Sequence, residues 1–149
     1  MADIQRHGQA HWSGDLLHGS GKISTGSGAL KGMAYSVPSR FESRKGTNPE
    51  ELLAAAHAAC FSMMLAKVLG DEQKSLKTID TRATLTLAQR TGAWRITTIH
   101  LDVEATGDGL NEETLKRAAE QAKEQCPVSL LLKPGLESIT LAVRLKGGS

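Results

Sequence analysis

The sequence predicts an α+β fold with antiparallel sheet. Three observations lead to this prediction. Short alternating runs separated by glycines fill the N-terminal third, an apolar run too long for a strand occupies the middle, and an alternating strand pair, a helix and a last strand follow. A chain of 149 residues is long enough to form one domain with its own core. We therefore predict a single domain over residues 1–149.

Strands are expected first, at Gly8 to Trp12, Gly21 to Thr25 and Gly32 to Val37. These runs are separated by stretches rich in glycine and serine, which are typical of turns. The N-terminal third should therefore form a hairpin or meander of antiparallel strands.

A long helix is predicted next, over Glu50 to Leu69. Asn48 is a suitable N-cap, Pro49 fits the first helical position, Glu51 stands where a capping box places it, and Gly70 is the expected stop. Because the helix is apolar on nearly every face, it should be buried all round. A chain this short with few aromatic residues cannot cover it alone, so we expect an obligate dimer in which two subunits sandwich the helix.

Two alternating strands should follow, over Ile79 to Leu87 and Trp94 to Val103, joined by a turn at Arg90-Thr91-Gly92. The alternation changes phase near Thr97 and Thr98, which predicts a bulge there. The strand pair should form an antiparallel hairpin.

A second helix is expected from about Asn111 to Gln125. Cys126 continues its inner apolar stripe, so its thiol should face inward. Pro127 disfavours helical geometry at Cys126 and can open a new short helix, PVSLLLK. Cys126 should therefore lie at a helix break, and a last strand should bury the face formed by Ile139, Leu141, Val143 and Leu145.

The composition argues against several classes of function. Aromatic residues make up 3% of the chain, and a net charge of +2 is spread over scattered Lys and Arg, which disfavours nucleic-acid binding. No run reaches the roughly 18 consecutive apolar residues of a membrane span, and the N-terminus lacks the apolar core of a signal peptide. Four histidines show no metal spacing: His7, His11, His18 and His100. We expect a cytoplasmic protein without a membrane, nucleic-acid or metal partner.

The chain has two cysteines, Cys60 and Cys126, which form neither a C-x-x-C motif nor a zinc-ligand cluster. A permanent structural disulfide is disfavoured in a reducing cytoplasm. By composition alone, the simplest interpretation is two small core residues. His57 can share a helix face with Cys60, which leaves open a Cys–His pair for acyl transfer or thiol hydrolysis, although no oxyanion-hole motif accompanies it.

Three segments resemble the OsmC branch of the OsmC/Ohr family: AHWSGDL, the run from Ser39 to Gly70 that contains NPEELLAAAHAACFSM, and CPVSLLLK from Cys126. The last two fix both cysteines together with their surroundings, so they outweigh the interpretation of inert core residues. The resemblance implies an intertwined homodimer with two long helices packed at the centre between antiparallel sheets. It also implies active sites at the subunit interface and the reduction of organic hydroperoxides without metal, haem or flavin.

The resemblance also implies the residue roles. Cys60 corresponds to the peroxidatic cysteine and Cys126 to the resolving cysteine. Arg40 corresponds to the arginine paired with the Cys60 thiolate, and Glu50 to the carboxylate that orients this arginine. The implied reductant is a lipoyl-bearing protein, for which small dithiols can substitute.

One departure distinguishes the two branches. The Ohr branch takes its arginine from the glycine-rich stretch near the N-terminus, which here offers His18 and Lys22 but no arginine. The OsmC branch takes it from the segment that is Arg40-Phe41-Glu42 here, so Arg40 is favoured over Arg44.

Elementary chemistry requires similar groups. The thiolate is the nucleophile, and Cys60 lies mid-helix in apolar surroundings, where the helix dipole does not help and burial raises the thiol pKa. A fixed cation such as Arg40 is therefore needed. A buried arginine requires a carboxylate. Glu50 and Glu51 are both candidates, and Glu51 has an alternative role in capping the helix at Asn48.

Attack on a peroxide leaves Cys60 as a sulfenic acid, which a second thiol must trap before over-oxidation. Cys126 can form that disulfide, which an external dithiol then reduces. Glu50 and Cys60 lie about 15 Å apart along one helix. We therefore expect a composite site with Cys60 and Cys126 from one subunit and Arg40 and Glu50 from the other. The alternative is a non-enzymatic stress protein that acts as a redox switch or binds a ligand.

Overall fold

The computed structural model describes residues 2–147 and divides into two compact units, Met1–Leu52 and Leu53–Ser149. Each unit has its own three-stranded sheet. The single domain expected over residues 1–149 stays a prediction.

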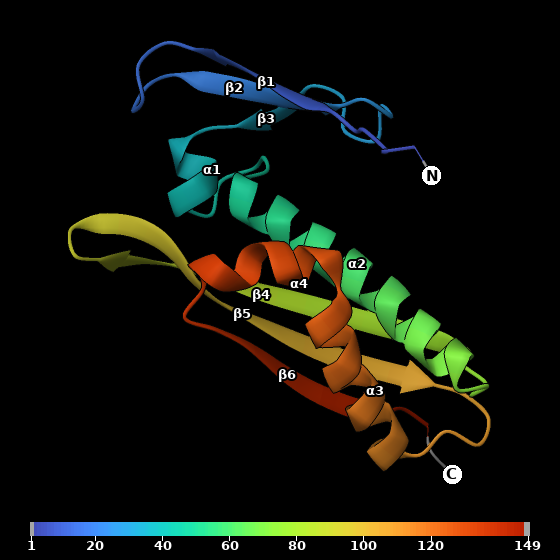
Figure 1. Cartoon of the computed structure of the whole chain (residues 1–149). Coiled ribbons are helices and arrows are strands. Elements are labelled where there is room, and N and C mark those ends of the chain that lie inside the picture. The colour runs from blue at the N-terminus through green and yellow to red at the C-terminus, as the bar shows by residue number, and fades with distance from the viewer. Residues whose placement is uncertain (1, 148–149) are drawn as a thin grey trace. The chain divides into compact units, whose positions relative to one another are not determined.

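The first unit contains an antiparallel sheet in the order β1 (Gly8–Ser13), β2 (Ser20–Thr25) and β3 (Met33–Tyr35) (Figure 1). The three predicted N-terminal strands are thus confirmed. Gly21 pairs with Tyr35 across the sheet, and a Cβ at Gly21 would lie 2.3 Å from the Tyr35 ring. The missing side chain therefore lets the aromatic ring lie against the strand.

A short helix that the sequence analysis missed follows this sheet. Val37 was expected to end a strand but instead begins α1 (Val37–Phe41). Ser36 is its N-cap and forms a capping box with Ser39, while Pro38 stands in its first turn. These local signals outweigh the alternating pattern that suggested an extended strand.

The second unit contains a sheet in the order β4 (Thr78–Arg90), β5 (Ala93–Thr106) and β6 (Ser138–Leu145). β4 and β5 form the predicted antiparallel hairpin. Its two turn residues, Thr91 and Gly92, have φ angles of 49° and 78°. Two positive φ angles are characteristic of the type I′ turn, whose twist matches that of the flanking strands.

The predicted bulge and the α+β class are confirmed. Thr98 pairs with Thr86 and Ile96 pairs with Leu87, which leaves Thr97 as the extra residue. The sheet departs from expectation in one respect, because β6 pairs with β5 in parallel and the sheet is mixed. The helical connection between β5 and β6 returns the chain to the end of the sheet at which β5 began, which allows parallel pairing.

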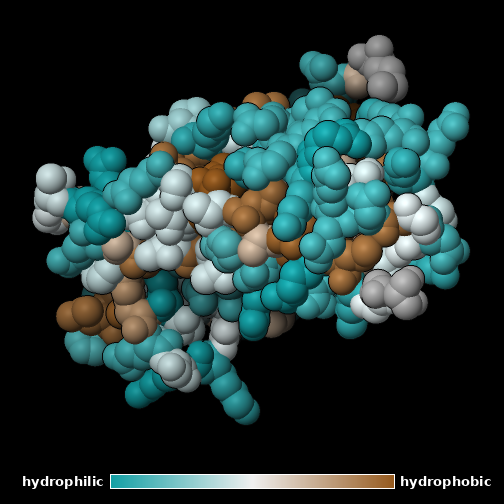
Figure 2. Space-filling model, turned by 90° about the horizontal axis from the view of Figure 1, so that it is seen from below, coloured by the Kyte–Doolittle hydropathy of each residue, from teal (hydrophilic) through white to brown (hydrophobic). Residues whose placement is uncertain are grey.

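Three helices cover one face of this sheet (Figure 1): α2 (Pro49–Asp71), α3 (Glu112–Gln125) and α4 (Pro127–Leu132). A short 3-10 helix, η1 (Lys133–Gly135), leads from α4 toward β6. The core lies between the helices and the sheet and includes Phe61, Leu65, Leu69, Ile99, Leu101, Val103, Leu115, Ala119 and Cys126. From below, where the sheet lies in Figure 1, the surface is mainly hydrophilic with scattered hydrophobic patches (Figure 2).

The end of α2 differs from the prediction. Gly70 was expected to stop the helix, but the helix continues through it. The left-handed residue is Gln73, with φ 57°. The Lys74 N–H donates to the Leu69 carbonyl at 2.9 Å, and the Gln73 N–H donates to the Gly70 carbonyl at 3.0 Å. These paired bonds define a Schellman cap, in which Gln73, three positions beyond Gly70, is the left-handed residue.

Within the chain, α2 buries one face only. His57, Phe61 and Leu65 are fully buried, whereas the Met63 side chain is 76% exposed. By length and composition, α2 is the one helix among residues 2–147 that could cross a membrane, a test that the core helix of a soluble protein also passes. The expectation that α2 is buried all round is therefore not met by one chain, and the dimer that would cover it stays a prediction.

Candidate active site

The fold brings the two cysteines together. Cys60 lies on α2, and Cys126 lies between α3 and α4, where it ends one helix and begins the next. Both are free thiols, and the predicted inward position of Cys126 is confirmed because it is fully buried. The Cys126 thiol affects the pKa of Cys60 through a hydrogen bond and through charge, so the two sulfur atoms are neighbours.

The break at Cys126 has the predicted cause. Cys126 has φ −59° and ψ 122°, the extended geometry that a residue before proline prefers. Its N–H donates to the Ala122 carbonyl at 2.8 Å and closes α3. Its own carbonyl accepts from the Leu130 N–H at 2.9 Å and opens α4. The thiol therefore lies at a bend that two helices hold in place.

The surroundings of Cys60 within this unit make its thiolate less stable. Burial raises the pKa of the Cys60 thiol, the Val128 N–H lowers it, and the hydrogen bond and charge of Cys126 raise it again, so that the balance is upward. In the described part of the second unit, no cation is among these causes. A reactive thiolate at Cys60 therefore requires a positive charge from elsewhere.

The first unit holds an arginine–carboxylate pair. Arg40 lies on α1 and Glu50 in the first turn of α2. The Arg40 Nε and Nη2 atoms donate to the same Glu50 oxygen, Oε1, at 2.9 and 2.6 Å. The Glu50 side chain is 12% exposed, and its Oε2 atom is buried without a hydrogen-bond partner among the described residues. The structure thus joins the arginine and the carboxylate that the sequence analysis selected.

Glu51 is engaged elsewhere, although not as expected. Asn48 is the N-cap of α2, since its Oδ1 accepts from the Glu51 N–H at 2.8 Å. The Glu51 side chain accepts from the Thr47 hydroxyl at 2.6 Å instead of reaching back to the Asn48 backbone. The Glu51 carboxylate is thus engaged by Thr47 at the helix entry, and Glu50 is the carboxylate that pairs with Arg40.

The two pairs belong to different units. Arg40 and Glu50 lie in Met1–Leu52, and the two cysteines lie in Leu53–Ser149. The structure establishes each pair, and their union in one active site is a proposal.

A third pair was missed by the sequence analysis. The Nε2 atom of His57 lies 2.7 Å from the hydroxyl of Ser129, and both side chains are buried. The Nδ1 atom of His57 is buried without a partner among the described residues. The only sequence signal was spacing, because His57 precedes Cys60 by one helical turn and Ser129 follows Cys126 by one. Neither ring nitrogen of His57 bonds to Cys60, because Nε2 contacts Ser129 and Nδ1 has no partner among the described residues, which disfavours the Cys–His pair considered from the sequence.

His57 should make folding stability depend on pH. Burial lowers the pKa of His57 from its usual value of 6.5, so the unfolded chain binds this proton more readily. The free energy of unfolding should be unaffected by His57 above pH 6.5 and should decrease below it, by up to about 1.4 kcal/mol per pH unit until the folded state also protonates. Urea unfolding at pH 7.5 and 5.5 would measure this, with His57→Gln as the control that lacks the effect. Equal losses in both proteins would contradict the prediction.

Comparison with known proteins gives a consistent result. The sequence profile of the family described as OsmC-like protein matches residues 42–140. The chain is 45% identical to Peroxiredoxin OsmC of Escherichia coli K12 over 143 residues, which cover 96% of this chain and 98% of the relative. It is 30% identical to the Organic hydroperoxide resistance protein-like protein of Mycoplasma pneumoniae, over 76% of this chain and 79% of the relative.

A solved structure agrees with the sequence matches. The organic hydroperoxide resistance protein OsmC from Legionella pneumophila superposes with a TM-score of 0.74 at 25% identity, covering 96% of this chain and 98% of the other. The family profile, the curated relatives and this structure all match over most of the chain. This protein therefore belongs to the OsmC-like family.

Proposed function

We propose that this protein is a cysteine-dependent peroxidase that reduces organic hydroperoxides to alcohols. The observation that carries the proposal is that two free thiols are neighbours, Cys60 on α2 and Cys126 at the start of α4. The names of the relatives support it, because one is called a peroxiredoxin and another an organic hydroperoxide resistance-like protein.

The chemistry uses the two sulfur atoms in sequence. The Cys60 thiolate attacks the terminal peroxide oxygen, the O–O bond breaks, and the departing alkoxide takes a proton to become the alcohol. Cys60 is left as a sulfenic acid. The Cys126 sulfur attacks it, which forms the disulfide and releases water. An external dithiol then reduces the disulfide, and a lipoyl-bearing protein is the proposed reductant.

Arg40 and Glu50 have distinct roles in this proposal. The Arg40 guanidinium stabilises the Cys60 thiolate and donates hydrogen bonds to the peroxide and to the leaving oxygen. The Glu50 carboxylate holds the guanidinium through two hydrogen bonds. Because a thiol supplies the electrons, the proposed reaction requires no metal, haem or flavin.

We place the complete site at the interface of a homodimer, with the cysteines from one subunit and Arg40 and Glu50 from the other. A partner subunit would also cover the exposed face of α2, where Met63 is 76% exposed. Sedimentation should show a dimer at micromolar concentration, and a monomer would contradict this arrangement.

Mixed dimers test the composite site directly. Neither Cys60→Ser nor Arg40→Ala homodimers should turn over hydroperoxide efficiently. After denaturation and co-refolding in equal amounts, half of the dimers contain both variants, and each of these has one intact site. Activity should therefore recover to about a quarter of the wild-type value. If mixing restores no activity although mixed dimers form, all four residues belong to one subunit.

Catalytic turnover distinguishes the peroxidase from a redox switch. The protein is treated with one and then with fifty equivalents of tert-butyl hydroperoxide, with and without dihydrolipoamide, and examined by mass spectrometry. A peroxidase should consume all fifty equivalents when the dithiol is present and accumulate the Cys60–Cys126 disulfide when it is absent. A switch should consume about one equivalent per subunit under both conditions, which would refute the proposed function.

A further inference from the structure

The hydrogen bond between His57 and Ser129 joins the two helices that carry the cysteines. His57 lies on α2 one turn before Cys60, and Ser129 lies in the first turn of α4, which begins at Cys126. The Nε2–Oγ distance is 2.7 Å. His57 is fully buried and Ser129 is 2% exposed, so this is a polar contact within the core.

The same turn of α4 supplies the groups that act on the Cys60 thiol. These are the thiol of Cys126 and the N–H of Val128, the residue just before Ser129. A displacement of this turn would move both groups away from Cys60. Ser129 lies in this same turn, so a contact that holds Ser129 also affects where both groups lie.

Beyond the bend at Cys126, the rest of α4 has few contacts that fix its position. It spans six residues, too few for a helix to be stable alone. Val128 and Leu132 pack partly against the core, but Leu130 and Leu131 are 56% and 75% exposed. Apolar contacts of this kind are not directional and tolerate sliding.

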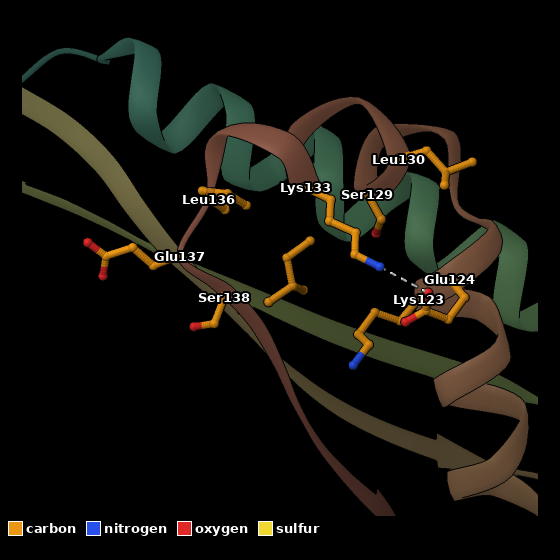
Figure 3. Close-up of a pocket in the computed structure, with 9 residues that line it drawn as sticks. Lys123, Glu124, Ser129, Leu130, Lys133, Leu136, Glu137 and Ser138 are labelled. Atoms are coloured by element: carbon orange, nitrogen blue, oxygen red, sulfur yellow. Dashed lines mark hydrogen bonds and ion pairs between the residues drawn. The ribbon is translucent and has the colours of Figure 1, made fainter.

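The side of α4 next to β6 borders a pocket instead of packed core. The pocket has a volume of ≈ 240 Å³ and lies between the end of α3, α4 and the start of β6 (Figure 3). Lys133 and Glu124 form an ion pair across it at 3.3 Å. Both side chains are more than half exposed, and exposed ion pairs contribute little to stability. Neither the pocket nor this ion pair therefore holds α4 firmly.

A buried hydrogen bond differs from these contacts because it requires a specific distance and direction. If α4 shifted, both His57 Nε2 and the Ser129 hydroxyl would be left unsatisfied in the core, which is costly. His57 already has an unpaired Nδ1 atom. The core therefore contains a polar pair, His57 and Ser129, at a place where two apolar side chains would pack without leaving a buried nitrogen unpaired.

We infer that His57 and Ser129 are positioning residues that hold the start of α4 against α2, so that the Cys126 thiol can trap the Cys60 sulfenic acid rapidly. This inference rests on the proposed function. The step that it accelerates is the condensation of Cys60–SOH with Cys126–SH, which forms the S–S bond and releases water. Slower closure leaves more sulfenic acid for a second hydroperoxide molecule, which oxidises it to sulfinic acid.

The test separates the two chemical steps. Disulfide closure is followed by quenched-flow mass spectrometry after one equivalent of tert-butyl hydroperoxide. The first step, oxidation of Cys60, is measured in a Cys126→Ser background. Ser129→Ala should slow closure by about tenfold, the effect of losing one buried hydrogen bond, and should increase the sulfinic fraction under excess hydroperoxide. The first step should slow by a smaller factor than closure, because it loses only the Val128 N–H, whereas closure requires Cys126 itself to be in place.

Ser62→Ala is the matched control. Its hydroxyl also ties α2 to a neighbouring element, through Thr81 of β4 at 2.7 Å. This variant should lose comparable stability but should close the disulfide at the wild-type rate. The inference is overturned if Ser129→Ala closes normally or if both steps slow by the same factor.

Variants of His57 decide the result if Ser129→Ala does not fold. His57→Gln can place an amide near the position of Nε2 and should retain fast closure, whereas His57→Asn is too short and should close slowly. Equal closure rates in the two variants would overturn the inference. If the wild-type protein forms no Cys60–Cys126 disulfide, the proposed function itself fails, and that result is visible before any variant is made.

Discussion

Replacing Cys60 with serine should reduce hydroperoxide turnover by at least about a thousandfold, the largest effect expected for any single substitution. A serine hydroxyl is far less nucleophilic than a thiolate and does not ionise near neutral pH. The rate of alcohol formation from tert-butyl hydroperoxide in the presence of dihydrolipoamide measures this loss. Turnover within about tenfold of the wild-type rate would show that another group breaks the O–O bond.

Cys126→Ser is the informative partner of this substitution. It should retain the first reaction, because Cys60 and its surroundings on α2 remain, and then stop at the sulfenic acid. Mass spectrometry should show one added oxygen per subunit, followed by two under excess hydroperoxide. If Cys126→Ser continues to turn over at the wild-type rate, the reductant acts directly on Cys60 and Cys126 has no resolving role.

Replacing Arg40 with alanine should have the largest effect of any substitution outside the two cysteines. Removing a neighbouring cation raises a thiol pKa by about one to three units, which lowers the thiolate fraction at neutral pH by about ten- to a thousandfold. The other influences on the Cys60 thiol, burial and the neighbouring Cys126, raise its pKa more than the Val128 N–H lowers it. Nothing in its own unit therefore compensates for the loss of the Arg40 charge. The rate of Cys60 alkylation by iodoacetamide, measured from pH 5 to 10 in a Cys126→Ser background, gives the pKa directly.

The sign of the pH effect distinguishes an electrostatic role from a structural one. In the wild-type protein the alkylation rate should rise with pH and level off at a low pKa, and in Arg40→Ala the same rise should occur at higher pH. The variant should therefore recover much of its rate in alkali. Arg40→Lys, which keeps the charge but loses the two-pronged contact with Glu50, should lie between the two. An unchanged profile in Arg40→Ala would assign the thiolate's stabilisation to another cation.

The candidate site could be predicted from the sequence only in part. Cys126 was placed correctly because both of its determinants are local: the helical stripe that ends at it and the proline that follows it. Asn48, Asn111 and the Thr91-Gly92 turn were predictable for the same reason, since each depends on residues within one turn of the chain. The helix that carries Arg40 was missed because alternation over Gly32 to Val37 was weighed above the Ser36 cap.

Long-range contacts were beyond any local pattern. Ser129 pairs with His57 because α4 packs beside α2, and neither residue has a neighbour in sequence that indicates the other. The parallel pairing of β6 with β5 likewise depends on how the α3–α4 connection crosses the sheet.

The sequence by itself determined the α+β class, the bounds of most elements, the burial of Cys126 and membership of the family. Periodicity, caps and motifs each depend on residues that are close together in the sequence. The resemblance predicted that Cys60 pairs with Cys126 and that Glu50 holds Arg40, and the structure shows both contacts. Only the tertiary structure decided that a buried histidine is tied to Ser129 and that β6 pairs with β5 in parallel. These outcomes depend on which side chains meet when separate elements pack, and that depends on distances through space.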